Sequence, residues 1–348
     1  MTVQIFDGHN DVLTRLDKVG GVAAAGTFLS GMDGQLDLPK ARAGGFGGGF
    51  FAIWIRGQGP GGFDLSSLVP PYDVPLPAPV PQPYAWEIAQ RQAALLHELD
   101  RLGALRLCTD TAQIVAARAE GKIAAILHLE GAEPLGPDLA ELDRLYDLGL
   151  RSLGPVWSRP TDFGHGVPFR YPSDSDIGPG LSPAGQALVE KCNALNILID
   201  LSHLNAAGFA DVARISNAPL VATHSNAHAV SPHARNLTDD QLAAIARSGG
   251  VVGLNFECSF LRPDGRPDTN TPPEVPLAHL DHLLNALGEE GVALGSDFDG
   301  CRPPVWLNSA DKLGALVAAM AAHGYDAARI ERICWGNWMR VLNETWGP

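Results

Sequence analysis

The chain has 348 residues, of which 45% are hydrophobic and 18% are charged, and its formal net charge is −14. This composition supplies ample apolar material for a large core and excludes an intrinsically disordered chain. A nucleic-acid partner and an anionic membrane surface are not expected, because an acidic protein is repelled by both.

The cysteines and the N-terminal residues predict the cellular compartment of the protein. The five cysteines are dispersed and form no C-x-x-C pair: Cys108, Cys192, Cys258, Cys301 and Cys334. This pattern argues against a disulfide framework or a thiolate zinc site and favours the reducing cytoplasm. No signal-peptide pattern precedes the first strand-like segment, and no run approaches the roughly 20 apolar residues of a membrane-spanning helix.

Short apolar runs alternate with longer helical patterns along the whole chain. Such an alternation indicates repeated βα units and a parallel sheet. The predicted strands are Gln4–Phe6, Phe50–Ile55, Ile123–Leu129, Leu150–Val156, Ile197–Leu201, Leu220–Thr223, Val251–Asn255 and Val292–Gly295. We therefore predict an α/β fold, a single (β/α)8 TIM barrel domain over residues 1–348, a length that barrels commonly reach.

Helices and one long insertion lie between these runs. Residues Tyr84–Leu105 place apolar side chains at spacings of three and four, which predicts a helix with one buried face. Ser182 followed by proline, and Thr238 with Gln241 as a capping box, predict two further helix starts. The stretch Gly57–Pro83 after the second strand is rich in proline and glycine, so we predict that it forms neither a ladder strand nor a regular helix. It would either form a wall of the substrate site or serve only as a surface linker.

A group of metal-ligand residue types follows the predicted strands. His9 and Asp11, two residues apart just past the first strand, form an H-x-D pair whose side chains project to the same side. Glu130, His203 and His224 each end or directly follow another strand. Any one of them could be an ordinary turn or core residue, but the carboxyl ends of barrel strands meet at one face. The set predicts a metal centre there.

Three imidazoles and two carboxylates exceed the three protein ligands typical of one catalytic zinc. Two ions roughly 3.5–4 Å apart, bridged by a carboxylate, would use the whole set. Glu130 is the expected bridge, because its strand lies between those that carry the histidines. A hydroxide held between the two ions would attack a carbonyl group.

Two further carboxylates follow the last strand in Gly295-Ser296-Asp297-Phe298-Asp299-Gly300. One of them should accept the proton of the attacking water and pass it to the leaving amine. We predict that Asp297, closer to the strand end, is this proton shuttle. The alternative is that Asp299 is the proton shuttle. If Asp297 has this role, Asp299 is a structural or calcium-like turn residue.

The chain resembles the membrane dipeptidase (renal dipeptidase) family, peptidase family M19 of the amidohydrolase superfamily, over essentially its whole length. The resemblance rests on Asp7-Gly8-His9-Asn10-Asp11, His128-Leu129-Glu130-Gly131, Gly180-Leu181-Ser182-Pro183 through Ile199-Asp200-Leu201-Ser202-His203, His224-Ser225-Asn226 through Arg235-Asn236, and Gly295 to Gly300.

This resemblance implies a dipeptidase with two Zn²⁺ ions. One ion would be held by His9, Asp11 and Glu130, and the other by Glu130, His203 and His224. Arg235, eleven residues after His224, would bind the C-terminal carboxylate of the substrate, a task suited to a bidentate guanidinium. The resemblance also implies tolerance of a D-residue at the C-terminal position. Barrel helices often pair subunits, so a homodimer is one expectation.

The sequence departs from the family at the fourth strand, where a Leu-Thr-His sequence is usual and its histidine is thought to polarise the scissile carbonyl. Here the stretch is Leu153-Gly154-Pro155-Val156-Trp157. Trp157 stands in place of the histidine, so another side chain such as His165 or Arg159 could donate to the oxyanion. His165 could equally be a plain loop residue.

Because of this departure from the family, the sequence allows more than one hypothesis about the substrate. The principal hypothesis is hydrolysis of a dipeptide, including L-Xaa-D-Xaa. An alternative within the same fold is hydrolysis of N-acyl amino acids, lactams or lactones, since a barrel does not fix its substrate. A third hypothesis is an inactive metal-binding scaffold.

Overall fold

The computed structural model describes residues 3–58 and 65–347. Eight parallel strands follow one another in the order β8-β6-β5-β2-β1-β11-β10-β9, and the bridge between Asp200 and Val221 joins the two ends of the series. Their bounds are β1 Ile5–Asn10, β2 Phe46–Trp54, β5 Ile123–Glu130, β6 Leu150–Gly154, β8 Leu198–Ile199, β9 Val221–Ala222, β10 Val251–Leu254 and β11 Val292–Leu294. The predicted (β/α)8 barrel is confirmed, and each of the eight predicted strands overlaps an observed one.

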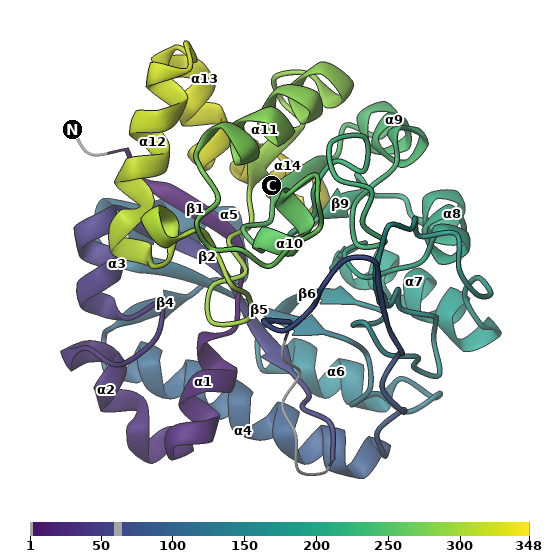
Figure 1. Cartoon of the computed structure of the whole chain (residues 1–348). Coiled ribbons are helices and arrows are strands. Elements are labelled where there is room, and N and C mark those ends of the chain that lie inside the picture. Colours follow the sequence, from purple (N-terminus) through teal and green to yellow (C-terminus); the bar gives the residue numbers. More distant parts are fainter. Residues whose placement is uncertain (1–2, 59–64, 348) are drawn as a thin grey trace.

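Helices surround the strands (Figure 1). They are α1 Val12–Val19, α2 Ala25–Ser30, α3 Leu38–Gly44, α4 Gln82–Arg101, α5 Thr111–Ala119, α6 Ala140–Asp147, α7 Pro183–Leu195, α8 Ala206–Ile215, α9 Asp239–Arg247, α10 Cys258–Leu261, α11 Glu274–Leu287, α12 Leu313–Ala322, α13 Ala327–Glu331 and α14 Asn337–Trp346. Short helical turns are η1 Gly21–Ala24, η2 Val305–Leu307, η3 Ala310–Lys312 and η4 Arg332–Gly336. The predicted caps are present, because Ser182 accepts from Gly185 N and Thr238 forms a capping box with Gln241.

The C-terminal segment packs its tryptophans into the interior of the barrel. The ring of Trp335 packs edge-on against Phe6, and that of Trp338 packs against Phe50. Trp338 is fully buried, and its indole N–H donates to the Leu294 carbonyl at 3.0 Å. These two tryptophans therefore form part of the packed barrel core.

The bounds of the first predicted strand and of the helix predicted over Tyr84–Leu105 need correction. Strand β1 continues to Asn10, so His9 lies within the strand rather than just past it. The helix predicted over Tyr84–Leu105 spans Gln82–Arg101, because proline is favoured in the first turn and Gly103 adopts a positive φ that ends the helix. Leu105 instead begins a short strand, β4 Leu105–Leu107, which pairs with the start of β5.

The Pro/Gly-rich insertion was predicted to contain no strand, and this was wrong. Its residues Tyr72–Val74 form strand β3, which pairs antiparallel with β7 Phe169–Tyr171 from the loop after β6. The prolines flank these three residues and leave their N–H groups free to pair. Residues 59–64 of the insertion lie outside the described part of the chain.

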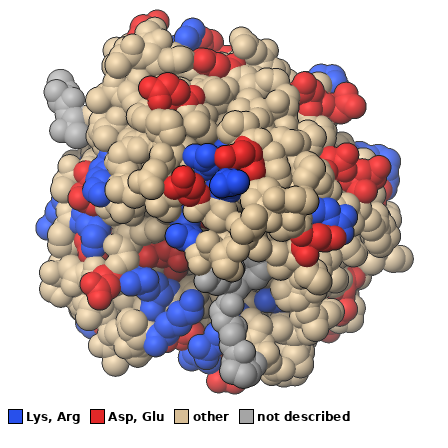
Figure 2. Space-filling view, in the orientation of Figure 1, with Lys and Arg blue, Asp and Glu red and all other residues tan. Residues whose placement is uncertain are grey.

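On the face shown in Figure 2, acidic and basic side chains are interspersed. Within residues 3–58 and 65–347, none of the helices combines the length and apolar character needed to cross a membrane.

Candidate active site

The Asp7–Asp11 segment places two of the candidate ligands at the carboxyl end of β1. His9 is fully buried, and its Nε2 lies 3.5 Å from Asp11 Oδ2. A glycine is required between Asp7 and His9, since a Cβ at Gly8 would overlap the carbonyl oxygen of Thr223. Gly8 thus allows β1 to pack closely against the backbone at Thr223, directly after β9.

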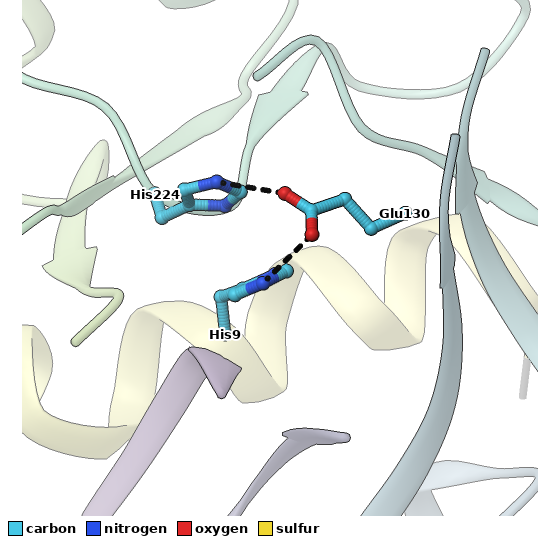
Figure 3. Close-up of side chains that lie close together, drawn as sticks. All are labelled: His9, Glu130 and His224. Carbon is cyan, nitrogen blue, oxygen red and sulfur yellow. Dashed lines mark ion pairs between the residues drawn. The ribbon is translucent and has the colours of Figure 1, made fainter. Parts of the chain in front are cut away.

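Glu130 ends β5 and directs its two carboxylate oxygens toward different histidines (Figure 3). Its Oε2 lies 3.5 Å from His9 Nε2. Its Oε1 lies 3.0 Å from His203 Nε2 and 3.4 Å from His224 Nε2. This division of contacts is what a carboxylate between two cations requires.

The proton positions on His224 follow from its neighbours. The Thr223 hydroxyl has one hydrogen and lies 2.6 Å from the Asp200 carboxylate, to which it donates. It must therefore accept from His224 Nδ1, which is 2.8 Å away. This leaves a lone pair on His224 Nε2, directed at His203 Nε2 across 3.1 Å. Two imidazole nitrogens at this distance are suited to a shared cation.

The electrostatics of the three histidines divide them into two kinds. Burial lowers the pKa of His203 and of His224 well below the ordinary value, so both are neutral at neutral pH. Burial acts on His9 in the same direction, but the Glu130 and Asp11 carboxylates outweigh it and raise the pKa of His9 well above its ordinary value. Both ring nitrogens of His9 lack a hydrogen-bond partner among the described residues. A metal ion bound there would have to displace the proton of His9 and would take over its attraction to the two carboxylates.

Asp297 lies beside the same group. Its carboxylate, His9 and Asp11 offer ligand atoms that all lie within 4.8 Å of one another. Asn255, directly after β10, donates its Nδ2 to Asp297 Oδ2 at 2.9 Å. Burial raises the pKa of Asp297 to about 8, and the charges of Asp11 and Glu130 act in the same direction. This carboxyl group is therefore able to hold a proton near neutral pH.

Asp299 has different surroundings. Its Oδ1 accepts from Gln35 N at 2.9 Å and its Oδ2 from Leu36 N at 3.3 Å. Arg15 Nε lies 3.7 Å from the same carboxylate. These contacts attach the segment before α3 to the loop after β11, which is a structural task.

Arg235 is only 3% exposed and forms no ion pair with any described carboxylate. Its Nη2 donates to the His224 carbonyl at 3.2 Å, and its guanidinium lies over the ring of Phe260 at 5.5 Å. Burial lowers the pKa of Arg235 to about 10, which leaves it charged at neutral pH. A buried cation without an anionic partner is a suitable place for a carboxylate ligand.

A cavity of about 10 Å³ is lined by this arginine together with Asn236 and Gln241, among other residues. Arg235 Nε, Asn236 Oδ1 and Gln241 Nε2 are buried there without a partner in the described chain. The volume corresponds to roughly one water molecule. Arg235 therefore shares this cavity with two other buried polar side chains.

The three remaining candidate residues, Trp157, His165 and Arg159, lie in different surroundings. Trp157 is 8% exposed, and its ring centroid is 5.9 Å from that of His203. His165 contacts the Gly166 carbonyl through Nδ1 at 3.0 Å, and a Cβ on Gly178 would touch its ring. Arg159 donates to Glu133 at 2.8 Å and to the Ile55 carbonyl at 3.0 Å. The described contacts join Trp157, but not His165, to the histidine cluster.

Several supporting residues were missed by the sequence reasoning. Besides Thr223, Asp200 and Asn255, they include Ser158, whose Oγ lies 2.8 Å from His203 Nδ1. A polar residue next to a candidate ligand was the available signal for Thr223, but Ser158 and His203 are brought together only by the barrel. His128 is also interior, with Nδ1 2.9 Å from Ser152 Oγ, and burial lowers its pKa to about 3.

The chain is similar to several known proteins. The model of the membrane dipeptidase family, peptidase family M19, matches residues 1–346. A metallo peptidase from Rhodobacter sphaeroides, crystallised with a phosphinate mimic of the dipeptide L-Ala-D-Ala, is 49% identical, with a TM-score of 0.96 over 99% of this chain and 100% of that one. The dipeptidase AC, a metallo peptidase of family M19, has the same identity and TM-score and covers 100% of both chains. An uncharacterized Klebsiella pneumoniae protein encoded in the pqqA 5′ region is 45% identical over 75% of this chain and 97% of its own length.

The chain is a metal-dependent hydrolase whose barrel holds a buried cluster of histidines and carboxylates. The chain belongs to the membrane dipeptidase family, peptidase family M19, and is a metallo-dipeptidase.

Proposed function

We propose that the protein hydrolyses dipeptides, including those of the L-Xaa-D-Xaa type, with two Zn²⁺ ions bound between β1, β5, β8 and β9. The observation that carries this proposal is the division of Glu130, whose Oε2 faces His9 and whose Oε1 faces His203 and His224. His9 and Asp11 would complete the set on one side of the bridge, and His203 and His224 on the other.

The donor set suits such ions. Imidazole and carboxylate ligands together favour zinc. The neutral state of His203 and His224, and the fixed tautomer of His224, supply lone pairs without loss of a proton. When bound, the two ions would supply a water that is ionised near neutral pH for attack on the amide carbonyl.

In this proposal, Asp297 carries the proton and Arg235 binds the substrate. Asp297 would accept the proton of the attacking water and deliver it to the leaving amine, while Asn255 holds the carboxyl group in place. Arg235 would bind the C-terminal carboxylate of the dipeptide, which would neutralise its buried charge. The mimic of L-Ala-D-Ala in the Rhodobacter sphaeroides relative supports a D-residue at that end.

The five free cysteines support a reducing, cytoplasmic location as part of this proposal. A homodimer is included as well, by analogy with the pairing of barrel helices.

The test is hydrolysis of L-Ala-D-Ala and L-Ala-L-Ala by the zinc-loaded protein, with a chelator-treated sample and the His203→Ala variant as controls. We expect cleavage that both controls abolish. Activity confined to N-acetyl-amino acids or lactones would replace the dipeptidase proposal with the alternative hydrolase. Two zinc ions bound without turnover of any of these compounds would indicate an inactive scaffold.

A further inference from the structure

A small group of aromatic rings lies apart from the main core, at the carboxyl ends of the strands. Its buried members are Trp157 after β6, Phe169 in β7 and Phe260 in α10, and their exposed fractions are 8%, 5% and 3%. Trp54 at the end of β2 and Val74 in β3 pack against them. We name Trp157, Phe169 and Phe260 the aromatic wall.

The aromatic wall extends from the candidate metal centre to Arg235. The centroid of Trp157 is 5.9 Å from that of His203, and the centroid of Phe169 is 5.8 Å from that of Trp157. Phe169 in turn stacks on Phe260, with an interplanar angle of 10° and a centroid distance of 5.8 Å. The guanidinium of Arg235 lies over the other end, 5.5 Å from the centroid of Phe260.

The insertion holds the middle ring in place. Strand β3 pairs with β7 in a register that sets Val74 opposite Phe169 and Tyr72 opposite Tyr171. Because side chains alternate along a strand, these four share one face of the two-stranded ribbon. That face is directed at the interior, since Phe169 stacks on Phe260 and the ring of Tyr72 lies 5.9 Å from that of His233. Asp73 and Arg170 form an ion pair of 2.7 Å on the opposite, exposed face.

We propose that the aromatic wall contacts the side chain of the C-terminal residue of the dipeptide and selects an apolar one. This inference rests on the proposed function, in which the scissile carbonyl lies at the metals and the terminal carboxylate at Arg235. The C-terminal residue then lies between these two points, beside the rings that connect them. A polar side chain there would lose its hydrogen bonds to water and find an aromatic surface in return.

The test compares L-Ala-D-Leu with L-Ala-D-Asn, because leucine and asparagine side chains have nearly the same shape and differ in polarity. The wild-type zinc enzyme should cleave the leucine substrate with a kcat/KM at least ~10-fold higher, the size of effect that one apolar contact gives. In Phe169→Ala the ratio should fall to about threefold or less, because water then reaches the substrate side chain. Phe260→Ala removes a ring from another element and should lower the ratio in the same direction if Phe169→Ala does not fold.

The matched control is Arg170→Gln, which changes the exposed face of the same ribbon and should keep the wild-type ratio. A wild-type kcat/KM ratio near one would overturn the proposal that the aromatic wall selects an apolar C-terminal side chain. The same holds for a ratio that is unchanged in both ring variants. Neither result would affect the proposal that the enzyme hydrolyses dipeptides. Failure of the wild-type enzyme to cleave any dipeptide, L-Ala-D-Ala included, would overturn the proposed function together with this inference.

Discussion

The hydroxyl of Thr223 donates to Asp200 and accepts from Nδ1 of His224, at 2.6 and 2.8 Å. This arrangement fixes the tautomer of a candidate ligand, and such partners commonly change metal affinity ~10–100-fold when they are lost. We expect Thr223→Val to weaken zinc binding by about that factor in a chelator-competition titration. Thr223→Ser keeps the hydroxyl and should restore most of the affinity. Equal affinities in wild type and Thr223→Val would show that the hydroxyl has no influence on the ligand.

Glu130 provides a direct test of the number of ions. Glu130→Gln removes the charge of the expected bridge and replaces one oxygen by a hydrogen-bond donor, which repels a cation. The zinc content of the purified variant, measured by elemental analysis, should fall from two ions per chain to one or none. A variant that keeps two ions with unchanged affinity would contradict the bridging role. Glu87, an exposed glutamate paired with Arg91 on α4, offers the matched Glu→Gln control.

The two carboxylates after β11 should respond differently to the loss of charge. Asp297→Asn should lower kcat ~10²–10⁴-fold, the usual contribution of a general acid or base. Asp299→Asn should leave kcat within about threefold but lower the thermal midpoint, because the carboxylate accepts from Gln35 and Leu36. Steady-state kinetics and thermal unfolding of both variants check this assignment. The reverse pattern would make Asp299 the proton shuttle.

Arg235 should matter only for substrates with a free C-terminal carboxylate. A charged hydrogen bond contributes about 1.5–3 kcal/mol, so Arg235→Met should lower kcat/KM for L-Ala-D-Ala by roughly 10–150-fold. The same variant should have little effect on L-Ala-D-Ala amide, which lacks the carboxylate. The ratio of the two kcat/KM values is the measurement, and an equal loss on both substrates would contradict carboxylate binding. Arg235→Lys keeps the charge without the fork and should give an intermediate ratio.

His279 makes the stability of the fold depend on pH. Its Nδ1 accepts from Ala227 N at 3.1 Å and its Nε2 donates to the Leu261 carbonyl at 2.8 Å. Burial lowers the pKa of His279 from 6.5 to about 4. Below pH 6.5 the unfolded chain takes up a proton that the folded chain refuses, so this contribution to stability is full above pH 6.5 and is lost as the pH falls toward 4. The loss is on the order of 3 kcal/mol over the whole interval.

Urea unfolding of chelator-treated wild type and His279→Gln at pH 7.5 and pH 5.0 measures this effect. The free energy of unfolding of the wild type should fall more between the two pH values than that of the variant, by about 1–2 kcal/mol. Equal decreases would show that other groups cause the acid sensitivity.

Much of the fold and the candidate ligand set could be predicted from the sequence. The eight apolar runs are short and buried on both faces, which is typical of parallel barrel strands. His9, Glu130, His203 and His224 each lie at the end of such a run, and the carboxyl ends of barrel strands share one face. The convergence of these residues therefore follows from local pattern and the symmetry of the fold.

Only the tertiary structure decided which other side chains join this group. The pairing of β3 with β7, which places Phe169 against Phe260, links segments about a hundred residues apart and leaves no periodic signal in three-residue strands. The contact of Ser158 with His203 and the different surroundings of Asp297 and Asp299 likewise depend on how the loops pack. Strand patterns are set by neighbours along the chain, whereas the walls of the site are set by side chains that meet only when the barrel closes.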